Sequence, residues 1–339
     1  MAGAGDKRPG GEFDLIAKLV QRAGEPATGE QLRVGIGDDA AVTVVEGATV
    51  TSVDMLVDGV HFRRATSSLR EIGRKALSVA LSDLAAMGAR PGEAYVALGL
   101  PSDLDEARCL ELYGGLGEVA AETATTLAGG DVSAAPALTL AVTVVGYAPT
   151  PERLVGRSGA RAGHALAVTG DLGGAAAGLL IIERPALRAG LDPAVTEALA
   201  RRQTDPTPRL AAGAALAGAG AAAMIDLSDG LGADAAQIAA ASEAWLRIEL
   251  DRLPLAAGVA EVAAAAGVDP IDVATAGGED YELLVAIAPQ RVSETVAAVE
   301  ATGTTLTVVG QVSEGEGVEL RGADGGRRPA RGFDHFDAR

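Results

Sequence analysis

Residues 222–241 read AAMIDLSDGLGADAAQIAAA, and this stretch decides the fold class. The run Ala222–Leu227 is short, apolar and followed by a turn signal, so it predicts a buried strand. Asp229 and Gly230 predict the tight turn, and the alanine-rich text after them predicts a helix over Gly230–Ala241. A strand that turns at once into a helix is typical of folds in which helices cover a sheet.

The same alternation of strands and helices extends through both halves of the chain. Further strands are predicted within Val34–Val57 and at Ala94–Leu100, Ala137–Tyr147, Ala165–Thr169, Leu246–Leu250, Tyr281–Ile287 and Thr304–Val309. Further helices are predicted at Phe13–Arg22, Ser68 to about Met87, Asp103–Leu127, up to Leu216, in two alanine-rich segments after Leu250, and near Val292–Thr302. The pattern predicts an α/β (α+β layered) fold.

The chain is long enough for two domains. It has 339 residues, and a domain of about 150 residues buries a core of its own. Pro149 and Pro151 mark the expected junction, because two prolines in three residues resist both helix and sheet. We therefore expect an N-terminal α/β domain over residues 1–149 and a C-terminal α/β domain over residues 150–339.

Composition excludes several classes of protein. The chain carries 28 Lys and Arg against 46 Asp and Glu, a formal net charge of −18, which argues against nucleic-acid binding because phosphate backbones are held by basic patches. One cysteine and three histidines exclude most zinc frameworks and favour a reducing cytoplasm. The first twelve residues lack a signal-peptide core, and the uncharged stretches do not predict a membrane span.

Several acids stand where a solvated acid is not expected. The predicted helix that begins at a Ser68/Glu71 capping box carries Asp83 on its apolar stripe, near Leu69 and Ile72. Asp226 follows Ile225 in a strand, on the face shared with Ser228. An unpaired buried carboxylate costs several kcal/mol or more, so these acids must be paired or neutralised.

Other acids stand at predicted strand ends or in glycine-flanked turns: Asp38, Asp39, Asp54, Asp58, Asp131, Asp229 and Glu279. Each taken singly could be a helix cap or a turn former. If four converge, carboxylates about 4 Å apart repel by roughly 4 kcal/mol per pair at an effective dielectric near 20, and cations must lie between them. Oxygen ligands without Cys or His favour Mg²⁺ or a similar hard ion.

A magnesium cluster on an acidic protein suggests phosphate chemistry, because metal ions let negative ligands approach negative side chains. No G-x-x-x-x-G-K-[ST] phosphate loop and no protein-kinase catalytic loop occurs in the chain. A nucleotide would therefore be held mainly through metal, with a few basic side chains helping.

Eight motifs in fixed order carry a resemblance to a known family. They are Gly35-Ile36-Gly37-Asp38-Asp39-Ala40, Asp54-Met55-Leu56-Val57 with His61-Phe62, Leu81-Ser82-Asp83-Leu84-Ala85-Ala86-Met87-Gly88, Gly129-Gly130-Asp131, Arg157-Ser158-Gly159-Ala160, Ile225-Asp226-Leu227-Ser228-Asp229-Gly230-Leu231, Gly277-Gly278-Glu279-Asp280-Tyr281-Glu282-Leu283 and Gly332-Phe333-Asp334-His335-Phe336. The chain resembles thiamine-monophosphate kinases, of the aminoimidazole-ribonucleotide-synthetase-like superfamily. The last two motifs separate this family from its superfamily relatives.

The resemblance implies a two-domain homodimer whose N-terminal sheets pair across the dimer, and ATP-dependent phosphorylation of thiamine monophosphate to thiamine diphosphate. It implies that the N-terminal domain binds metal and ATP and that the C-terminal domain completes the ATP and substrate site. Its implied residue roles are Mg²⁺ ligands at Asp39, Ser52, Val53, Asp54, Asp83, Asp131, Asp226 and Asp229, ATP contacts at Tyr113, Gly130, Asp131, Arg157 and Ser228, substrate contacts at His61, Glu279 and Phe333, and catalytic carboxylates at Asp54, Asp83, Asp131 and Asp226. Val53 stands where the family often has Thr, so its ligand would be the backbone carbonyl.

The expected mechanism is direct in-line transfer. A phosphate monoester acceptor has a second pKa near 6, so its oxygen is mostly anionic at pH 7 and needs no general base.

Two rival functions stay open. One is a superfamily relative that forms an acyl or imino phosphate on another small molecule, and the other is a non-catalytic sensor of magnesium-bound nucleotide. Four of the candidate residues also have a purely structural interpretation. Arg157 could form a surface ion pair, Tyr113 could be packed in the core, Glu279 could be an acid in a turn, and Phe333 could anchor the C-terminal segment in the core.

Overall fold

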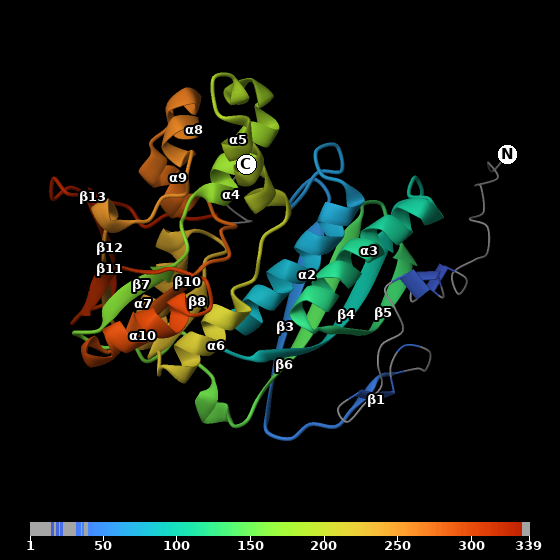
Figure 1. Cartoon of the computed structure of the whole chain (residues 1–339), viewed down its shortest axis with the longest axis horizontal. Helices are drawn as coiled ribbons and strands as arrows, with labels where there is room; N and C mark the ends of the chain where they lie inside the picture. The colour runs from blue at the N-terminus through green and yellow to red at the C-terminus, as the bar shows by residue number, and fades with distance from the viewer. Residues whose placement is uncertain are drawn as a thin grey trace. The chain divides into compact units, whose positions relative to one another are not determined.

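The computed structural model describes residues 15–16, 18–19, 21–22, 32–34, 36 and 40–333 (Figure 1). It divides into two compact units. Unit 1 takes in the described residues up to Leu81 and Pro91–Tyr147, and unit 2 takes in Ser82–Arg90 and the described residues from Ala148 onward. Part of the helix expected at Phe13–Arg22 and the motif residues Gly35, Gly37, Asp38, Asp39 and 334–336 lie outside the described residues.

Unit 1 contains a four-stranded sheet in the order β3-β6-β4-β5 and a two-stranded antiparallel sheet, β1-β2. The bounds are β1 Leu32–Val34, β2 Val42–Thr43, β3 Ala48–Val57, β4 Arg90–Leu100, β5 Thr126–Ala134 and β6 Thr139–Ala148. Helices α2 (Leu69–Ala86) and α3 (Glu106–Thr123) lie along the four-stranded sheet (Figure 1). The capping box that starts α2 is confirmed: Ser68 Oγ and its backbone N–H both donate to Glu71, and the Glu71 N–H donates back to Ser68 Oγ.

Strand β3 lies at the edge of its sheet and shows a clean alternation of exposure along its length. Ser52, Asp54 and Leu56 share one face, and Leu56 is buried. On the opposite face Val53 is 64% exposed and Met55 is 57% exposed. The edge of this sheet therefore presents apolar side chains that no described part of the chain covers.

Unit 2 is built on a seven-stranded sheet in the order β13-β12-β9-β11-β7-β10-β8. Its strands are β7 Ala165–Thr169, β8 Ala223–Asp226, β9 Trp245–Glu249, β10 Leu283–Ile287, β11 Leu306–Ser313, β12 Gly317–Arg321 and β13 Arg327–Arg328. Neighbouring strands of this sheet are antiparallel except β12 and β9, which are parallel. Its α-helices are α4 Gly174–Glu183, α5 Pro193–Thr204, α6 Leu210–Gly218, α7 Leu231–Ser242, α8 Val259–Ala266, α9 Pro270–Ala276 and α10 Val292–Glu300.

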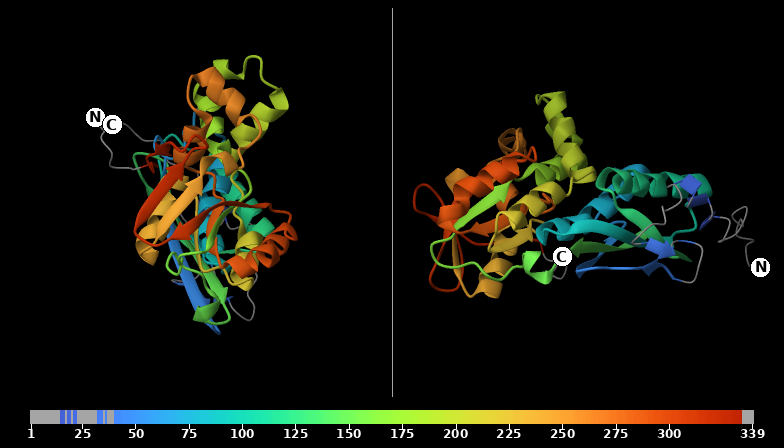
Figure 2. Two further views of the ribbon diagram at one scale, coloured as in Figure 1. Left: turned by 90° about the vertical axis from the view of Figure 1, so that its left-hand side faces the viewer. Right: turned by 60° about the horizontal axis from the view of Figure 1, so that its bottom comes forward.

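Strand β10 shows how completely this sheet is covered. All five of its residues are buried. Leu284 and Ala286 belong to the apolar cluster on one face, and Leu283, Val285 and Ile287 belong to the cluster on the other. A strand covered on both faces reads as a continuous apolar run rather than an alternating one. Helices α4, α5 and α8 share a third apolar cluster, and they stand together in yellow-green and orange in both views of Figure 2.

The main error of sequence reasoning in the fold lies around Gly129–Asp131. We expected a helix as far as Leu127 and a glycine-flanked turn after it, but α3 ends at Thr123 and residues 126–134 form β5, parallel to β4. Gly130 is a glycine because a Cβ at this position would collide with the Val96 carbonyl of β4. Close approach of two strands, rather than a turn, explains the glycine here.

Candidate active site

Two loops of unit 2 pair through their backbones and bring sequence-distant candidate residues together. Strand β8 ends at Asp226, and the loop after it receives the loop that precedes β10. The Glu279 N–H donates to the Ser228 carbonyl at 2.7 Å, and the Tyr281 N–H donates to the Leu227 carbonyl at 2.9 Å. Ser228 and Glu279, predicted to bind ATP and substrate, are therefore direct neighbours.

The last described residues join the same loop pair. The Phe333 N–H donates to the Asp229 carbonyl at 2.8 Å. A Cβ at Gly332 would lie 2.6 Å from that carbonyl, and a Cβ at Gly232 would lie 2.6 Å from the Arg331 carbonyl, so both glycines allow a close approach of backbones. Phe333 is 48% exposed. Three separate segments thus place Ser228, Asp229, Glu279 and Phe333 in one part of unit 2.

Asp226 is buried, as its strand position predicts, and it is paired with a residue that we did not single out. The Ser82 hydroxyl, at the C-terminal end of α2, donates to Asp226 Oδ2 at 2.8 Å. Asp83 is half-buried, whereas Ser82 is fully buried. The expectation that Asp83 lies in the buried stripe of its helix is therefore corrected, because the fully buried polar side chain at this end of α2 is Ser82.

Asp234 is a further acid of this site that sequence reasoning missed. It lies in the first turn of α7, and its Oδ2 accepts the Asp229 N–H at 3.1 Å and the Gly230 N–H at 3.0 Å. Burial, followed by the negative charges of Asp226 and Asp229, raises the pKa of Asp234 to about 8 against the lowering effect of the two hydrogen bonds. Three carboxyl groups are thus close enough in unit 2 for their charges to interact.

The predicted metal ligands are distributed over both units. Ser52, Val53, Asp54 and Asp131 belong to unit 1, Asp83, Asp226 and Asp229 belong to unit 2, and Asp39 lies outside the described residues. Among the residues that the structure describes, no three His, Cys, Asp or Glu side chains form a group that could hold a metal ion. The metal cluster remains a prediction. The oxygen-only donor set and the mutual repulsion around Asp234 fit a hard cation.

The candidates on β3 and β5 have distinct environments. Ser52 and Asp54 are partly buried on one face of β3, and the Val53 side chain lies on the other face. Only the backbone carbonyl of Val53 can therefore serve as a ligand together with the side chains of Ser52 and Asp54. Gly130 and Asp131 are exposed within β5. Asp131 Oδ2 accepts a hydrogen bond from Ser133 Oγ at 3.1 Å. Asp131 was expected in a turn, and the structure places it in the strand.

His61 follows β3 and has a defined tautomer. The Val57 N–H donates to His61 Nδ1 at 3.1 Å, so in the neutral ring the proton lies on Nε2. The buried Lys75 donates from Nζ to the His61 carbonyl at 3.3 Å. His61 can therefore donate a hydrogen bond from Nε2 to a ligand.

The two remaining ATP candidates differ in exposure. Tyr113 is buried on α3, and burial raises the pKa of its hydroxyl to about 12. Arg157 is exposed, and its carbonyl accepts a hydrogen bond from Ser242 Oγ at 3.0 Å. Contact of either residue with ATP stays a prediction.

Behind the Glu279 loop lies a network of charged groups that anchors it. The fully buried Glu282 accepts from Arg209 Nε at 2.8 Å and from Thr169 Oγ1 at 2.8 Å. Arg202 donates to Glu282 at 3.2 Å and to Asp171 at 2.7 Å. A buried carboxylate with three donors is satisfied, so this network fixes the end of the loop where β10 begins.

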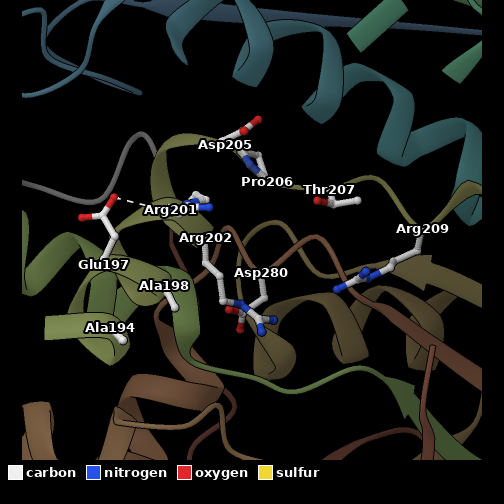
Figure 3. Close-up of a pocket in the computed structure, with 10 residues that line it drawn as sticks. All are labelled: Ala194, Glu197, Ala198, Arg201, Arg202, Asp205, Pro206, Thr207, Arg209 and Asp280. Carbon is white, nitrogen blue, oxygen red and sulfur yellow. Dashed lines mark ion pairs between the residues drawn. The ribbon is translucent and has the colours of Figure 1, made fainter. Parts of the chain in front are cut away.

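A cavity of about 530 Å³ adjoins this network (Figure 3). Arg202 extends from α5 towards Asp280, and Arg209 enters from the other side of the view. Asp280 accepts the Gly173 N–H at 2.7 Å and the Ala175 N–H at 3.1 Å. Burial raises the pKa of Asp280 to about 6, against the effect of these two hydrogen bonds.

Comparisons with known proteins show the family of the chain. The model of the AIR synthase related protein N-terminal domain matches residues 37–148, and that of the C-terminal domain matches residues 161–323. The thiamine-monophosphate kinase of Mycobacterium tuberculosis (strain CDC 1551 / Oshkosh) is 39% identical over 278 residues, which cover 81% of this chain and 80% of that protein.

Two solved structures extend the similarity to the fold. The crystal structure of thiamine-monophosphate kinase from Stenotrophomonas maltophilia K279a matches with a TM-score of 0.82 and 35% identity, over 94% of this chain and 98% of that one. A structure of AaThiL complexed with AMPPCP and TMP matches with a TM-score of 0.77 and 32% identity, over 96% and 97% of the two chains. The expected two-domain fold is confirmed, and the chain belongs to the thiamine-monophosphate kinase family of the AIR synthase related proteins.

Proposed function

We propose that this chain transfers the terminal phosphoryl group of ATP to thiamine monophosphate and so forms thiamine diphosphate. The observation that carries the proposal is the convergence of Ser228, Asp229, Glu279 and Phe333, which backbone hydrogen bonds hold together from three separate segments. Glu279 and Phe333 belong to the two motifs that separate the family from its superfamily relatives. A relative that matches over most of its length is solved with AMPPCP and TMP, a nucleotide analogue together with the acceptor.

The proposed reaction is direct in-line transfer without a phosphoenzyme. The acceptor phosphate is already mostly a dianion at pH 7, so the side chains need only position it and offset its charge. His61 is placed to donate from Nε2 to the acceptor phosphate. Arg157 offsets charge on the ATP phosphates, with Tyr113, Gly130 and Ser228 as further proposed nucleotide contacts.

We propose Mg²⁺ as the cation of this site. The residues that would hold it are Asp39, Ser52, Val53, Asp54, Asp83, Asp131, Asp226 and Asp229. Their oxygen donors fit a hard cation, and the charges of Asp226 and Asp229 lie close enough to Asp234 to add to the effect of burial on its pKa. When bound, the metal would offset phosphate charge. Asp54, Asp83, Asp131 and Asp226 are the proposed catalytic carboxylates, because they would orient the phosphates through it.

At the thiamine end, Glu279 is placed to accept from the aminopyrimidine or to offset the thiazolium charge. Phe333 offers an exposed ring for stacking on the cationic heterocycle. The two are held on adjacent backbones through Ser228 and Asp229. Glu279 and Phe333 would therefore select thiamine monophosphate over other phosphate esters.

We propose that the protein works as a homodimer in the cytoplasm. A second copy that covers the exposed Val53 and Met55 on β3 would complete the unit 1 sheet, as the family resemblance implies. In the part of the chain that the structure describes, every helix is too short or too polar to pass through a bilayer. Neither nucleic acid nor membrane is a proposed partner of this acidic chain.

The test is an assay of thiamine diphosphate formation from ATP and thiamine monophosphate, with and without Mg²⁺. We expect turnover only with the metal and only with this acceptor. ADP release stimulated by a different small molecule would favour a superfamily relative that makes an acyl or imino phosphate. Nucleotide binding without turnover on any acceptor would favour the sensor.

A further inference from the structure

Gln203, on α5, makes one directed contact with the candidate substrate site. Its Nε2 donates to Glu279 Oε2 at 2.5 Å. A carboxylate oxygen can only accept, so the orientation of the amide is fixed with the nitrogen towards Glu279. The bond joins a neutral donor to an ionised acceptor, which is a strong class of hydrogen bond.

The other end of the same amide has no partner. Gln203 is only 7% exposed, and among the described residues its Oε1 is the one buried side-chain nitrogen or oxygen without a hydrogen bond. A Cβ at Gly178 of the neighbouring helix α4 would lie 3.2 Å from Gln203 Cβ, so the side chain is packed closely where it leaves the helix. Leaving a buried carbonyl unpaired costs free energy of folding.

A second cost falls on the residue that Gln203 contacts. Glu279 has φ 61° and Tyr281 has φ 50°, in the left-handed region that residues with a Cβ rarely adopt. Strain held in a loop by the surrounding structure is a pointer to function. The neighbouring Arg202 donates hydrogen bonds to Glu282 and Asp171 within the buried network, so the loop has an anchor besides Gln203.

We propose that Gln203 is a positioning residue that fixes the Glu279 carboxylate for binding of the thiamine moiety, at the expense of folding stability. The inference rests on the proposed function, because it assigns the use of Glu279 to the thiamine end of the substrate. Gln203 does not touch the substrate, since its free oxygen is buried. Its effect is therefore on the KM for thiamine monophosphate and is exerted through Glu279 alone.

The experiment compares Gln203→Met with Leu199→Met, a buried neighbour on the same helix that has no polar contact. Met preserves the volume of Gln and removes both the bond to Glu279 and the unpaired oxygen. We expect Gln203→Met to raise the KM for thiamine monophosphate about tenfold and to change kcat and the KM for ATP by less than about twofold. Its Tm should be no more than about 2 °C below that of the wild type. Leu199→Met should leave both KM values unchanged.

The double variant decides whether the effect passes through Glu279. In a Glu279→Gln background, Gln203→Met should raise the KM by less than about twofold. A full additive rise there, an unchanged KM in the single variant, or a Tm more than about 2 °C below wild type would each overturn the proposal. Wild-type protein that fails to phosphorylate thiamine monophosphate would instead overturn the proposed function, and the Tm of Gln203→Met would still report whether Gln203 is kept at a cost in stability.

Discussion

Strand β10 of unit 2 and strand β3 of unit 1 bury their side chains in opposite ways. Residues 283–287, LLVAI, are all buried, because apolar clusters cover both faces of the sheet. Residues 48–57, ATVTSVDMLV, alternate, and Val53 and Met55 remain exposed. The sheet of unit 2 is complete within one chain, whereas the edge of the unit 1 sheet carries apolar groups that a second surface could bury.

The largest expected effect tests whether both regions serve one reaction. Asp54→Asn in unit 1 and Asp226→Asn in unit 2 should each lower kcat at least about 1000-fold, because each removes a full negative charge from the proposed cation site, and three factors of ten correspond to about 4 kcal/mol. Steady-state assays of variants that retain wild-type circular dichroism measure this. Asp251→Asn, an exposed acid of unit 2, is the matched control and should keep full activity. Near-normal turnover in either site variant would separate that unit from the chemistry.

The second prediction measures the difference in burial directly. Leu284→Ala in β10 should destabilise unit 2 by about 2–5 kcal/mol, and Met55→Ala in β3 should destabilise unit 1 by less than about 0.5 kcal/mol. Urea unfolding followed by circular dichroism measures both variants, because both units contain helices and strands. Leu284→Met, which preserves volume, should cost less than about 1.5 kcal/mol. Equal effects of the two alanine variants would contradict the contrast.

The third prediction concerns the exposed side chains of β3. Met55→Asp should convert a dimer into a monomer at micromolar concentration, because a buried unpaired charge at an interface costs several kcal/mol. Sedimentation velocity distinguishes the two states. Val268→Asp, at a 43% exposed valine of unit 2, should remain dimeric. Wild-type protein that sediments as a monomer would show that the β3 face is left uncovered in solution.

The smallest expected effect is on the pH dependence of stability, which should have opposite signs for one acid in each unit. Burial raises the pKa of Asp280 in folded unit 2 to about 6. The protonated carboxyl group therefore contributes its full stabilisation at a pH below the pKa of the unfolded chain, and this stabilisation is lost as the pH rises through about 6. Hydrogen bonds from Arg70 and Arg74 lower the pKa of Glu118 in unit 1, so its contribution is present above its usual pKa and is lost as pH falls.

Calorimetry from pH 4 to pH 7 checks these signs. As pH rises, the Tm of Asp280→Asn should increase relative to wild type by about 3 °C, and the Tm of Glu118→Gln should decrease relative to wild type. Parallel curves for either variant and the wild type would show that its carboxyl group titrates alike in the folded and unfolded chains.

Local signals predicted most of the fold, and non-local packing explains the failure at β5. Strand β7 occupies the expected residues, because an apolar run between turn signals needs no partner to be recognised. Residues 126–134 contain two glycines and an acid, which favour a turn when they are considered alone. Their strand depends on β4, whose backbone comes so close to Gly130 that a side chain cannot fit.

The candidate site shows the same limit. Asp226 and Asp229 could be predicted because a strand followed by a tight turn places acids at a sheet end. Asp234 was missed because an acid in the first turn of a helix is ordinary. Gln203 was missed because its segment, RRQTD, carries no motif, and its contact with Glu279 joins residues 76 positions apart. Only the tertiary structure reveals such pairs.

The absence of a side chain at Gly232, on α7, determines where the segment that leads to Phe333 can lie. The Arg331 backbone can lie against α7 because residue 232 contributes only a hydrogen atom there. Gly232→Ala would insert one methyl group between helix and chain and displace the aromatic side chain two residues further on, without altering any charge. The position of the Phe333 ring thus depends on the size of residue 232 and not on its charge. Variants at this position would change stacking of the ring on a heterocycle while leaving the charges around that heterocycle unchanged.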